Sequence, residues 1–162
     1  MLENLRCSMA TECVILIGLP ASGKTTFYRE RFAATHTHVS KDLLRNSRHA
    51  DRRQEQLIAE SLSQNRSVVV DNTNAGVDVR ARLIALARAH GATITGFYFP
   101  TAPAEALRRN RTRTGRARVP DIAIFAIRKR LEPPALEEGF DCLFSVSLDE
   151  EKGTFEVAPY SR

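Results

Sequence analysis

Runs of apolar and β-branched residues alternate along the chain with segments in which apolar residues recur every three or four positions. The runs predict five strands, at residues 13–17, 37–40, 67–70, 92–99 and 142–148. The periodic segments predict helices at residues 24–34, 52–64, 79–87, 103–109 and 122–131. Because the two kinds of element alternate, we expect an α/β fold in which helices flank a parallel five-stranded sheet and ligands bind at the carboxyl ends of the strands.

The length and composition fit one domain. The chain has 162 residues, of which 43% are hydrophobic, enough for a substantial core. We expect this domain at residues 13–148, after a loose leader at 1–12 and before a C-terminal tail at 149–162. No apolar stretch approaches the roughly 20 residues that a bilayer requires, and the chain does not begin with a signal-peptide pattern. These features predict a cytoplasmic protein with no membrane partner.

The three cysteines favour reduced thiols. Cys7, Cys13 and Cys142 are odd in number, far apart and outside any zinc-binding spacing. We therefore expect no disulfide framework, no disulfide-linked partner and no zinc site.

Basic residues are concentrated in one part of the chain. The formal net charge is +5, which favours an anionic partner but is also common on ordinary protein surfaces. Between Glu105 and Arg130, nine basic residues stand against two acidic ones. This stretch predicts a local surface that attracts phosphate groups.

Residues 18–25 read GLPASGKT and match the phosphate-binding pattern GxxxxGK[ST] between a predicted strand and a predicted helix. In such a P-loop, backbone N–H groups wrap the phosphates of a nucleoside triphosphate. Lys24 is expected to reach the β- and γ-phosphates, and the Thr25 hydroxyl to ligate Mg²⁺. The residues expected around the nucleotide are Gly18, Pro20, Ala21, Ser22, Gly23, Lys24, Thr25 and Thr26. The alternative is a glycine-rich turn that only caps a helix.

The P-loop alone leaves open whether water, a metabolite or a polymer receives the phosphoryl group, but four further motifs carry a resemblance. They are VSKDLLR (39–45), VVVDNTN (68–74), RNRTR (109–113) with VP (119–120), and RLEPPALEEGFD (130–141). In this order they resemble the signatures of the polynucleotide 5′-kinase family, the kinase domain of polynucleotide kinase/phosphatases, and the resemblance covers residues 13–148. It implies a P-loop kinase fold with an arginine-rich lid, and phosphorylation of a 5′-hydroxyl on DNA or RNA with ATP and Mg²⁺.

Asp42 follows the second predicted strand, at the edge of the sheet where the P-loop also lies. There its carboxylate can accept the proton of an attacking hydroxyl, and the resemblance makes it the candidate general base. The alternative is a helix N-cap, a position that aspartate favours. Arg45 lies on the same side of the emerging helix. Its match in the phage members implies a contact with a substrate phosphate, and the alternative is a solvated arginine.

Asp71 ends the third predicted strand, where acidic residues commonly orient Mg²⁺ or its water shell. The resemblance implies that the segment Asp71, Asn72, Thr73 and Asn74 holds the substrate. The phage pattern sets its aspartate against Asn72, whereas the animal pattern agrees with this chain residue for residue, so a metal-orienting and a substrate-holding role for Asp71 both stay open. The alternative for Asn72 and Asn74 is an Asx turn or a helix cap.

Four arginines, Arg109, Arg113, Arg116 and Arg118, surround a polar, glycine-containing stretch that we interpret as the lid. An arginine placed on the γ-phosphoryl group neutralises charge on the transferring oxygens. The spacing that the resemblance implies favours Arg113 for this catalytic role, with Arg116 as its competitor, and places Arg109 beside the nucleotide. The alternative is a solvated basic face.

The main hypothesis is therefore a kinase in which Asp42 deprotonates a 5′-hydroxyl while Lys24, Mg²⁺ and Arg113 stabilise the transferring group. Its expected partners are nucleic acid 5′ ends and ATP. A second hypothesis is a P-loop kinase that acts on a small metabolite or antibiotic. A third is a regulatory ATP-binding switch, in which Asp42 and the arginines would have no catalytic task.

Overall fold

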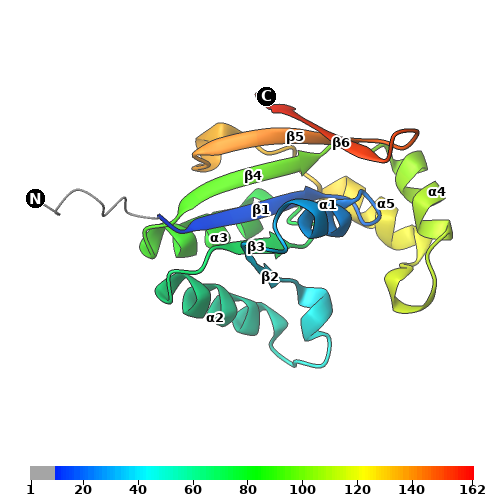
Figure 1. Ribbon diagram of the computed structural model, residues 1–162. Coiled ribbons are helices and arrows are strands. Elements are labelled where there is room, and N and C mark those ends of the chain that lie inside the picture. The colour runs from blue at the N-terminus through cyan, green and yellow to red at the C-terminus, as the bar shows by residue number, and fades with distance from the viewer. Residues whose placement is uncertain (1–9) are drawn as a thin grey trace, which may run out of the picture.

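The computed structural model describes residues 10–162 and contains one six-stranded sheet (Figure 1). Its strands are β1 (Glu12–Gly18), β2 (Thr37–Val39), β3 (Val68–Asp71), β4 (Thr93–Phe99), β5 (Cys142–Asp149) and β6 (Thr154–Pro159). The strand order is β2-β3-β1-β4-β5-β6, and every pairing is parallel except that of β5 with β6. The predicted α/β architecture is confirmed.

Five α-helices connect the strands, and each corresponds to a predicted helix. They are α1 (Lys24–Arg31), α2 (Ala50–Ser63), α3 (Val77–Ala89), α4 (Pro103–Arg111) and α5 (Asp121–Arg130). Short 3₁₀ turns add η1 (Lys41–Leu44), η2 (Gly115–Ala117) and η3 (Leu136–Glu138). Helix α3 ends just before Gly91, whose φ of +72° is readily adopted by glycine.

Successive residues of a strand point to opposite faces of the sheet, and helices cover both faces. Along β1, Val14 and Leu16 join a core with Phe27 of α1. The intervening residue Ile15 joins the larger core on the other face, which contains Ile58 of α2 together with side chains of α3, α4 and α5. Helix α1 therefore covers one face of the sheet, and the remaining helices cover the other.

The prediction of five strands was wrong by one, because residues 154–159 of the expected tail form β6. The chain reverses before β6 at Gly153, whose φ is +65°. The Asp149 carboxylate stabilises the reversal by accepting hydrogen bonds from the backbone N–H groups of Glu151 and Lys152, each 3.1 Å long. Phe155 of β6 then packs on Phe27 of α1, with ring centroids 5.3 Å apart. A short strand that buries an aromatic ring thus completes the edge of the sheet.

The last of the four motifs, residues 130–141, is joined to α3 by hydrogen bonds of Glu132 and Glu138. Arg80 of α3 is fully buried, and its guanidinium donates to both carboxylate oxygens of Glu138, at 2.7 and 2.8 Å. Glu132 accepts a hydrogen bond of 3.2 Å from the backbone N–H of Val77, at the start of α3. The segment after α5 is thereby fixed to α3.

Within residues 10–162, no helix combines the length and apolarity needed to cross a bilayer. In this part of the chain Cys13 is buried in β1, Cys142 is exposed at the start of β5, and both are free thiols. Burial raises the pKa of the Cys13 thiol to about 12. Cys7 and most of the predicted leader lie outside the described residues.

Candidate active site

The predicted site residues follow three neighbouring strands. Strands β2 and β1 both pair with β3 in the parallel sense, so their carboxyl ends lie at one edge of the sheet (Figure 1). The P-loop leaves β1 at this edge, η1 with Asp42 follows β2, and β3 ends at Asp71 with residues 72–74 directly after it. The structure thus brings together the three motifs that were predicted to hold nucleotide, base and substrate.

The P-loop backbone approaches its neighbours too closely for larger side chains. A Cβ atom added to Gly18 would lie 2.9 Å from the Cβ of Phe99, closer than unbonded carbon atoms approach. Gly23 has a φ of +97°, and a Cβ there would lie 3.2 Å from the Phe155 ring. Ala21 also adopts a positive φ, of 61°. Pro20 and the buried Ser22 complete the loop, and Thr26 lies exposed in the first turn of α1.

Lys24 is buried and points back into the P-loop. Its ammonium donates to the carbonyls of Gly18 and Leu19, at 3.0 and 2.6 Å, and to the Ser22 hydroxyl at 3.3 Å. Burial lowers the pKa of Lys24 to about 8, an effect that Asp71 opposes. The ammonium is therefore held against the P-loop itself, and its contact with phosphates stays a prediction.

Asp71 forms the centre of a buried hydrogen-bonded group. Its Oδ2 accepts from the Thr25 hydroxyl at 2.7 Å, and His38 Nε2 lies 2.9 Å from the same oxygen. His38 stacks on Tyr28 of α1, with ring centroids 4.0 Å apart. Burial works against ionisation of Asp71, but the hydrogen bonds of His38 and Thr25 hold its pKa below the usual value. Asp71 is therefore an anion beside the P-loop.

The second carboxylate oxygen of Asp71 remains available. Among residues 10–162 no group donates to Asp71 Oδ1, yet no fully buried side-chain nitrogen or oxygen in this range lacks a hydrogen bond. Asp71 Oδ1 is consequently in contact with solvent. Together with the Thr25 hydroxyl it offers the hard oxygen ligands that Mg²⁺ prefers.

Asp42 is not the cap of η1. The Ser40 hydroxyl occupies that position and accepts a hydrogen bond of 3.3 Å from the backbone N–H of Asp42. The Asp42 side chain is 78% exposed and forms an ion pair of 3.0 Å with Arg45. It also lies close enough to Lys24 to oppose the lowering of that residue's pKa. The carboxylate is thus exposed near the P-loop, with Arg45 as its partner.

The asparagines of the DNTN motif are engaged within the protein. The buried side chain of Asn74 donates to the carbonyls of Leu16 and Val70, at 2.7 and 3.3 Å. Asn72 is bonded on both sides, to the backbone N–H of Lys41 and to Gln54. Thr73 contributes its backbone carbonyl, which accepts from the N–H of Gly18 at 3.0 Å. Within the described structure, the Asn72 and Asn74 amides hold strands and turns together.

The arginine-rich loop, residues 112–120, joins α4 to α5 and is mostly exposed, with Arg113 partly buried. Asn110 closes its base, because its buried amide donates to the Val119 carbonyl at 2.7 Å and accepts from the Val119 N–H at 3.1 Å. Arg113 acts on Lys24 by lowering its pKa further, so its charge lies near the P-loop. The guanidinium of Arg45 contacts the Arg116 carbonyl, at 3.2 and 3.3 Å. A lid movement of this loop stays a prediction.

Arg109 is occupied by acidic neighbours. Its Nε donates to Glu150 at 2.6 Å, and its guanidinium also pairs with Glu105 one turn earlier in α4. Arg108 binds the same Glu150, at 2.7 Å. A contact between Arg109 and a nucleotide stays a prediction, and in this structure it would compete with these ion pairs.

Three site residues were missed by sequence reasoning. His38 had no ligand-like spacing, Gln54 belongs to no motif, and Ser40 lies in the VSKDLLR motif but was assigned no role. The available signal was topological, since His38 lies on the strand that pairs with β3. For Gln54 the signal was its spacing, three and four residues before Leu57 and Ile58, on the apolar side of the predicted helix.

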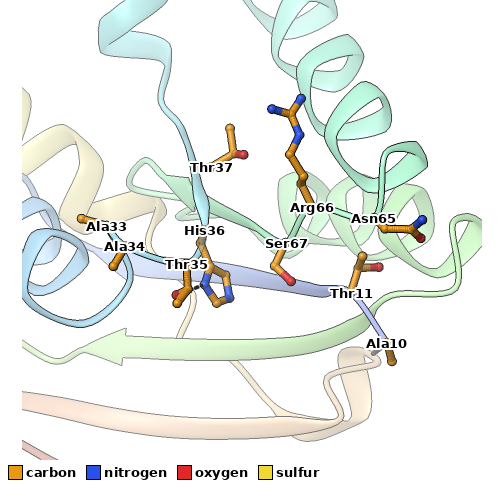
Figure 2. A pocket seen from close by; sticks show the side chains of 10 residues that line it. All are labelled: Ala10, Thr11, Ala33, Ala34, Thr35, His36, Thr37, Asn65, Arg66 and Ser67. Carbon is orange, nitrogen blue, oxygen red and sulfur yellow. Dashed lines mark hydrogen bonds between the residues drawn. The ribbon is translucent and has the colours of Figure 1, made fainter. Parts of the chain in front are cut away.

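A hollow of about 480 Å³ lies at the edge of the sheet opposite to the P-loop (Figure 2). Thr11, Thr37 and Ser67 line it at the amino ends of β1, β2 and β3, opposite to the P-loop edge. His36 projects into it, already bonded to Glu12 at 3.0 Å and Thr35 at 2.8 Å. The hollow is therefore separate from the candidate active site.

Comparison with known proteins gives both sequence and fold relatives. A family model described as an AAA domain matches residues 13–134. A bifunctional polynucleotide phosphatase/kinase of Schizosaccharomyces pombe is 28% identical over 133 residues, which are 80% of this chain and 32% of the relative. The chain thus spans about a third of the length of that relative.

Solved structures of several substrate classes share the fold. A Chloroflexus aurantiacus protein superposes with a TM-score of 0.70 at 18% identity, over 90% of this chain and 89% of its own. A fungal RNA kinase gives 0.61 at 17% identity, over 88% and 77%. A Janibacter sugar kinase gives 0.63 at 14% identity, over 84% and 86%. At these identities the likeness shows the fold alone.

Proposed function

The chain belongs to the AAA domain family and has a kinase-type P-loop fold; from this premise we propose that it transfers the γ-phosphoryl group of ATP to the 5′-hydroxyl of a polynucleotide, DNA or RNA. The polynucleotide phosphatase/kinase relative supports this choice of acceptor. The arginine-rich loop at the same end of the molecule supports an acceptor that carries phosphates.

The observation that carries the proposal is the state of Asp42. An aspartate just after a strand commonly serves as an N-cap, but here Ser40 has that task. Asp42 is left exposed and within electrostatic reach of Lys24. A carboxylate in this position suits a general base for a hydroxyl that approaches the P-loop.

The residues of this edge fit a magnesium nucleotide. Backbone N–H groups of the P-loop and Lys24 would hold the phosphates, and Thr25 with Asp71 Oδ1 would face the metal. Residues 10–162 contain no cluster of three His, Cys, Asp or Glu side chains able to hold a metal, so most ligands of Mg²⁺ would be phosphate and water oxygens. When bound, the ion neutralises charge on the phosphates.

In the proposed reaction, Asp42 accepts the proton of the 5′-hydroxyl while that oxygen bonds to the γ-phosphorus. The bond from this phosphorus to the bridging oxygen breaks, and ADP leaves with the electron pair. Lys24 and Arg113 neutralise charge on the transferring group. Arg45 then serves to hold a substrate phosphate, for which it must exchange its present contacts with Asp42 and the Arg116 carbonyl.

A small-molecule acceptor is the second candidate, favoured by the pairing of basic residues. Arg108 and Arg109 share Glu150, Arg109 also pairs with Glu105, and Arg111 lies 3.7 Å from Asp121. The basic stretch therefore offers less free positive charge than its sequence suggests. A small hydroxyl compound would need little of it.

Transfer of label from γ-labelled ATP tests the proposal. We expect label on an oligonucleotide with a 5′-hydroxyl and none on the same oligonucleotide with a 5′-phosphate. Label on sugars or nucleosides with none on any oligonucleotide would favour the second candidate. ATP binding without transfer to any acceptor would contradict both.

A further inference from the structure

Gln54 and Asn72 form a pair of side-chain amides beneath the turn that carries Asp42. Gln54 lies on α2 and is only 4% exposed. Its Oε1 accepts a hydrogen bond of 2.7 Å from Asn72 Nδ2, and Asn72 Oδ1 accepts one of 2.9 Å from the backbone N–H of Lys41. The pair thus connects α2, the end of β3 and the first residue of η1.

The backbone N–H of Lys41 fixes the orientation of both amides. This group can only donate, so Asn72 must present its oxygen to it. Asn72 Nδ2 then faces Gln54 and can also only donate, which requires Gln54 to present Oε1. Only one arrangement of the two amides satisfies all three groups.

The hydrogen bonds of Asn72 and Gln54 attach η1 to a buried part of the protein, and η1 itself lies at the surface. None of the four residues of η1 is buried, and Leu43 is 67% exposed. Asp42 itself is held by the Ser40 hydroxyl and by the exposed ion pair with Arg45, and exposed ion pairs stabilise little. The hydrogen bond from the Lys41 N–H to Asn72 therefore ties the backbone next to Asp42 to the end of β3, and the Lys41 side chain adds an ion pair with the exposed Asp51 of α2.

We propose that Gln54 is a positioning residue for the phosphoryl acceptor site, acting through Asn72 to hold Asp42 beside the P-loop. The inference rests on the proposed function, because it assigns Gln54 to the placement of the general base. Gln54 touches neither reacting group in this account. Its effect is transmitted by the amide oxygen that locks Asn72 against the Lys41 N–H.

Hydrogen exchange of the Lys41 amide tests the anchor without any enzymatic assay. In Gln54→Met, which keeps size but removes the acceptor, we expect exchange to be about tenfold faster, the effect of losing one hydrogen bond. Gln54→Glu keeps an acceptor for Asn72 Nδ2 and should restore slow exchange. Gln56→Met makes the same change at an exposed position of α2 and should have no effect. Equal Lys41 exchange in wild type and Gln54→Met would overturn the inference, even if the wild-type chain phosphorylated no oligonucleotide.

Single-turnover transfer to a 5′-hydroxyl oligonucleotide tests the consequence for chemistry. Misplacement of a catalytic group by about 1 Å can cost on the order of 100-fold in rate, so we expect a loss of about tenfold or more in Gln54→Met, with the Kd for ATP within about twofold of wild type. The double variant Gln54→Met/Asn72→Ala should be no slower than Asn72→Ala. A loosened Lys41 amide with an unchanged transfer rate, or additive losses in the double variant, would overturn the positioning role.

Discussion

Asp71 and Asp42 lie at the same edge of the sheet, yet the side chain of Asp71 is 4% exposed and that of Asp42 is 78% exposed. Asp71 belongs to the phosphate half of this edge, where the P-loop, Lys24 and Thr25 are held by hydrogen bonds and by the aromatic rings beneath α1. Asp42 belongs to the acceptor half, where η1 and the arginine-rich loop are exposed.

Under the proposed function, the two halves meet different ligands. Triphosphates present the same oxygens in every reaction cycle, so donors fixed in advance cost no reorganisation when the substrate binds. An acceptor strand must enter and leave, which requires solvent access and side chains able to exchange partners. We infer that packing and hydrogen bonds hold the phosphate half rigid, whereas a few hydrogen bonds position the acceptor half.

The largest effect is expected in the arginine-rich loop. Under the proposed mechanism, Arg113→Ala should slow single-turnover transfer by about 10³-fold, the scale of a lost arginine finger. Arg116→Ala should change the rate by less than about threefold, because only Arg113 among the two acts on Lys24. A larger loss in Arg116→Ala than in Arg113→Ala would reverse their assignment.

The rigidity of the phosphate half can be measured by unfolding. Phe155→Ala removes a buried ring from the core beneath α1, and we expect the free energy of unfolding in urea to fall by about 3–5 kcal/mol. Leu43→Ala in the acceptor half should change it by less than about 0.5 kcal/mol, since Leu43 is exposed. Similar losses in the two variants would remove the contrast between the halves.

Nucleotide affinity should depend on pH through Lys24, whose pKa is about 8 in the nucleotide-free protein. Phosphates favour the charged lysine, so binding raises its pKa and takes up a proton above pH 8. ATP affinity should therefore fall above pH 8, by up to about tenfold per unit. Calorimetry at pH 7.5 and pH 9, in buffers of different ionisation heat, measures both the affinity and the proton uptake. Lys24→Met should show neither dependence.

Lys24 also affects the stability of the protein without nucleotide. There its contribution to the free energy of unfolding rises with pH, whereas ATP affinity falls. Unfolded, Lys24 has its ordinary pKa of 10.5, so between pH 8 and 10.5 the unfolded chain binds more protons than the folded protein. The Lys24 contribution to the free energy of unfolding therefore rises with pH across this window. A wild-type curve that parallels that of Lys24→Met would contradict the depressed pKa.

The smallest effect concerns Arg45. Because its ion pair with Asp42 is exposed, Arg45→Ala should change the free energy of unfolding by less than about 0.5 kcal/mol. If Arg45 contacts a substrate phosphate, oligonucleotide binding should weaken severalfold and its dependence on salt should decrease by about one unit of slope. An unchanged slope would assign Arg45 to the turn alone.

Sequence patterns predicted the phosphate half better than the acceptor half. The P-loop is one continuous stretch whose glycines and lysine act locally, and the strands that carry it are continuous apolar runs. β6 was missed because the short segment that forms it follows a charged turn. It is a strand through its antiparallel pairing with β5, which sequence spacing did not indicate. The pattern that predicted Arg109 beside the nucleotide could not indicate that Glu150, in the turn between β5 and β6, comes to lie against Arg109.

The acceptor half depends on contacts between residues distant in the sequence. That Ser40 rather than Asp42 caps η1 is decided by backbone angles, and the Gln54 and Asn72 amides meet only after α2 has packed beside β3. Sequence spacing correctly placed the DNTN motif at the edge of the sheet. It gave no means to tell whether an asparagine there faces a substrate or a neighbouring strand.

The most direct test of the division between the two carboxylates compares Asp42→Asn with Asp71→Asn. The Kd for ATP with Mg²⁺ and the single-turnover rate of transfer to a 5′-hydroxyl oligonucleotide should be measured for both variants. The account predicts that Asp42→Asn binds the nucleotide as the wild type does but transfers at least about 100-fold more slowly, whereas Asp71→Asn weakens the magnesium-dependent binding itself. Transfer at the wild-type rate by Asp42→Asn would contradict the account.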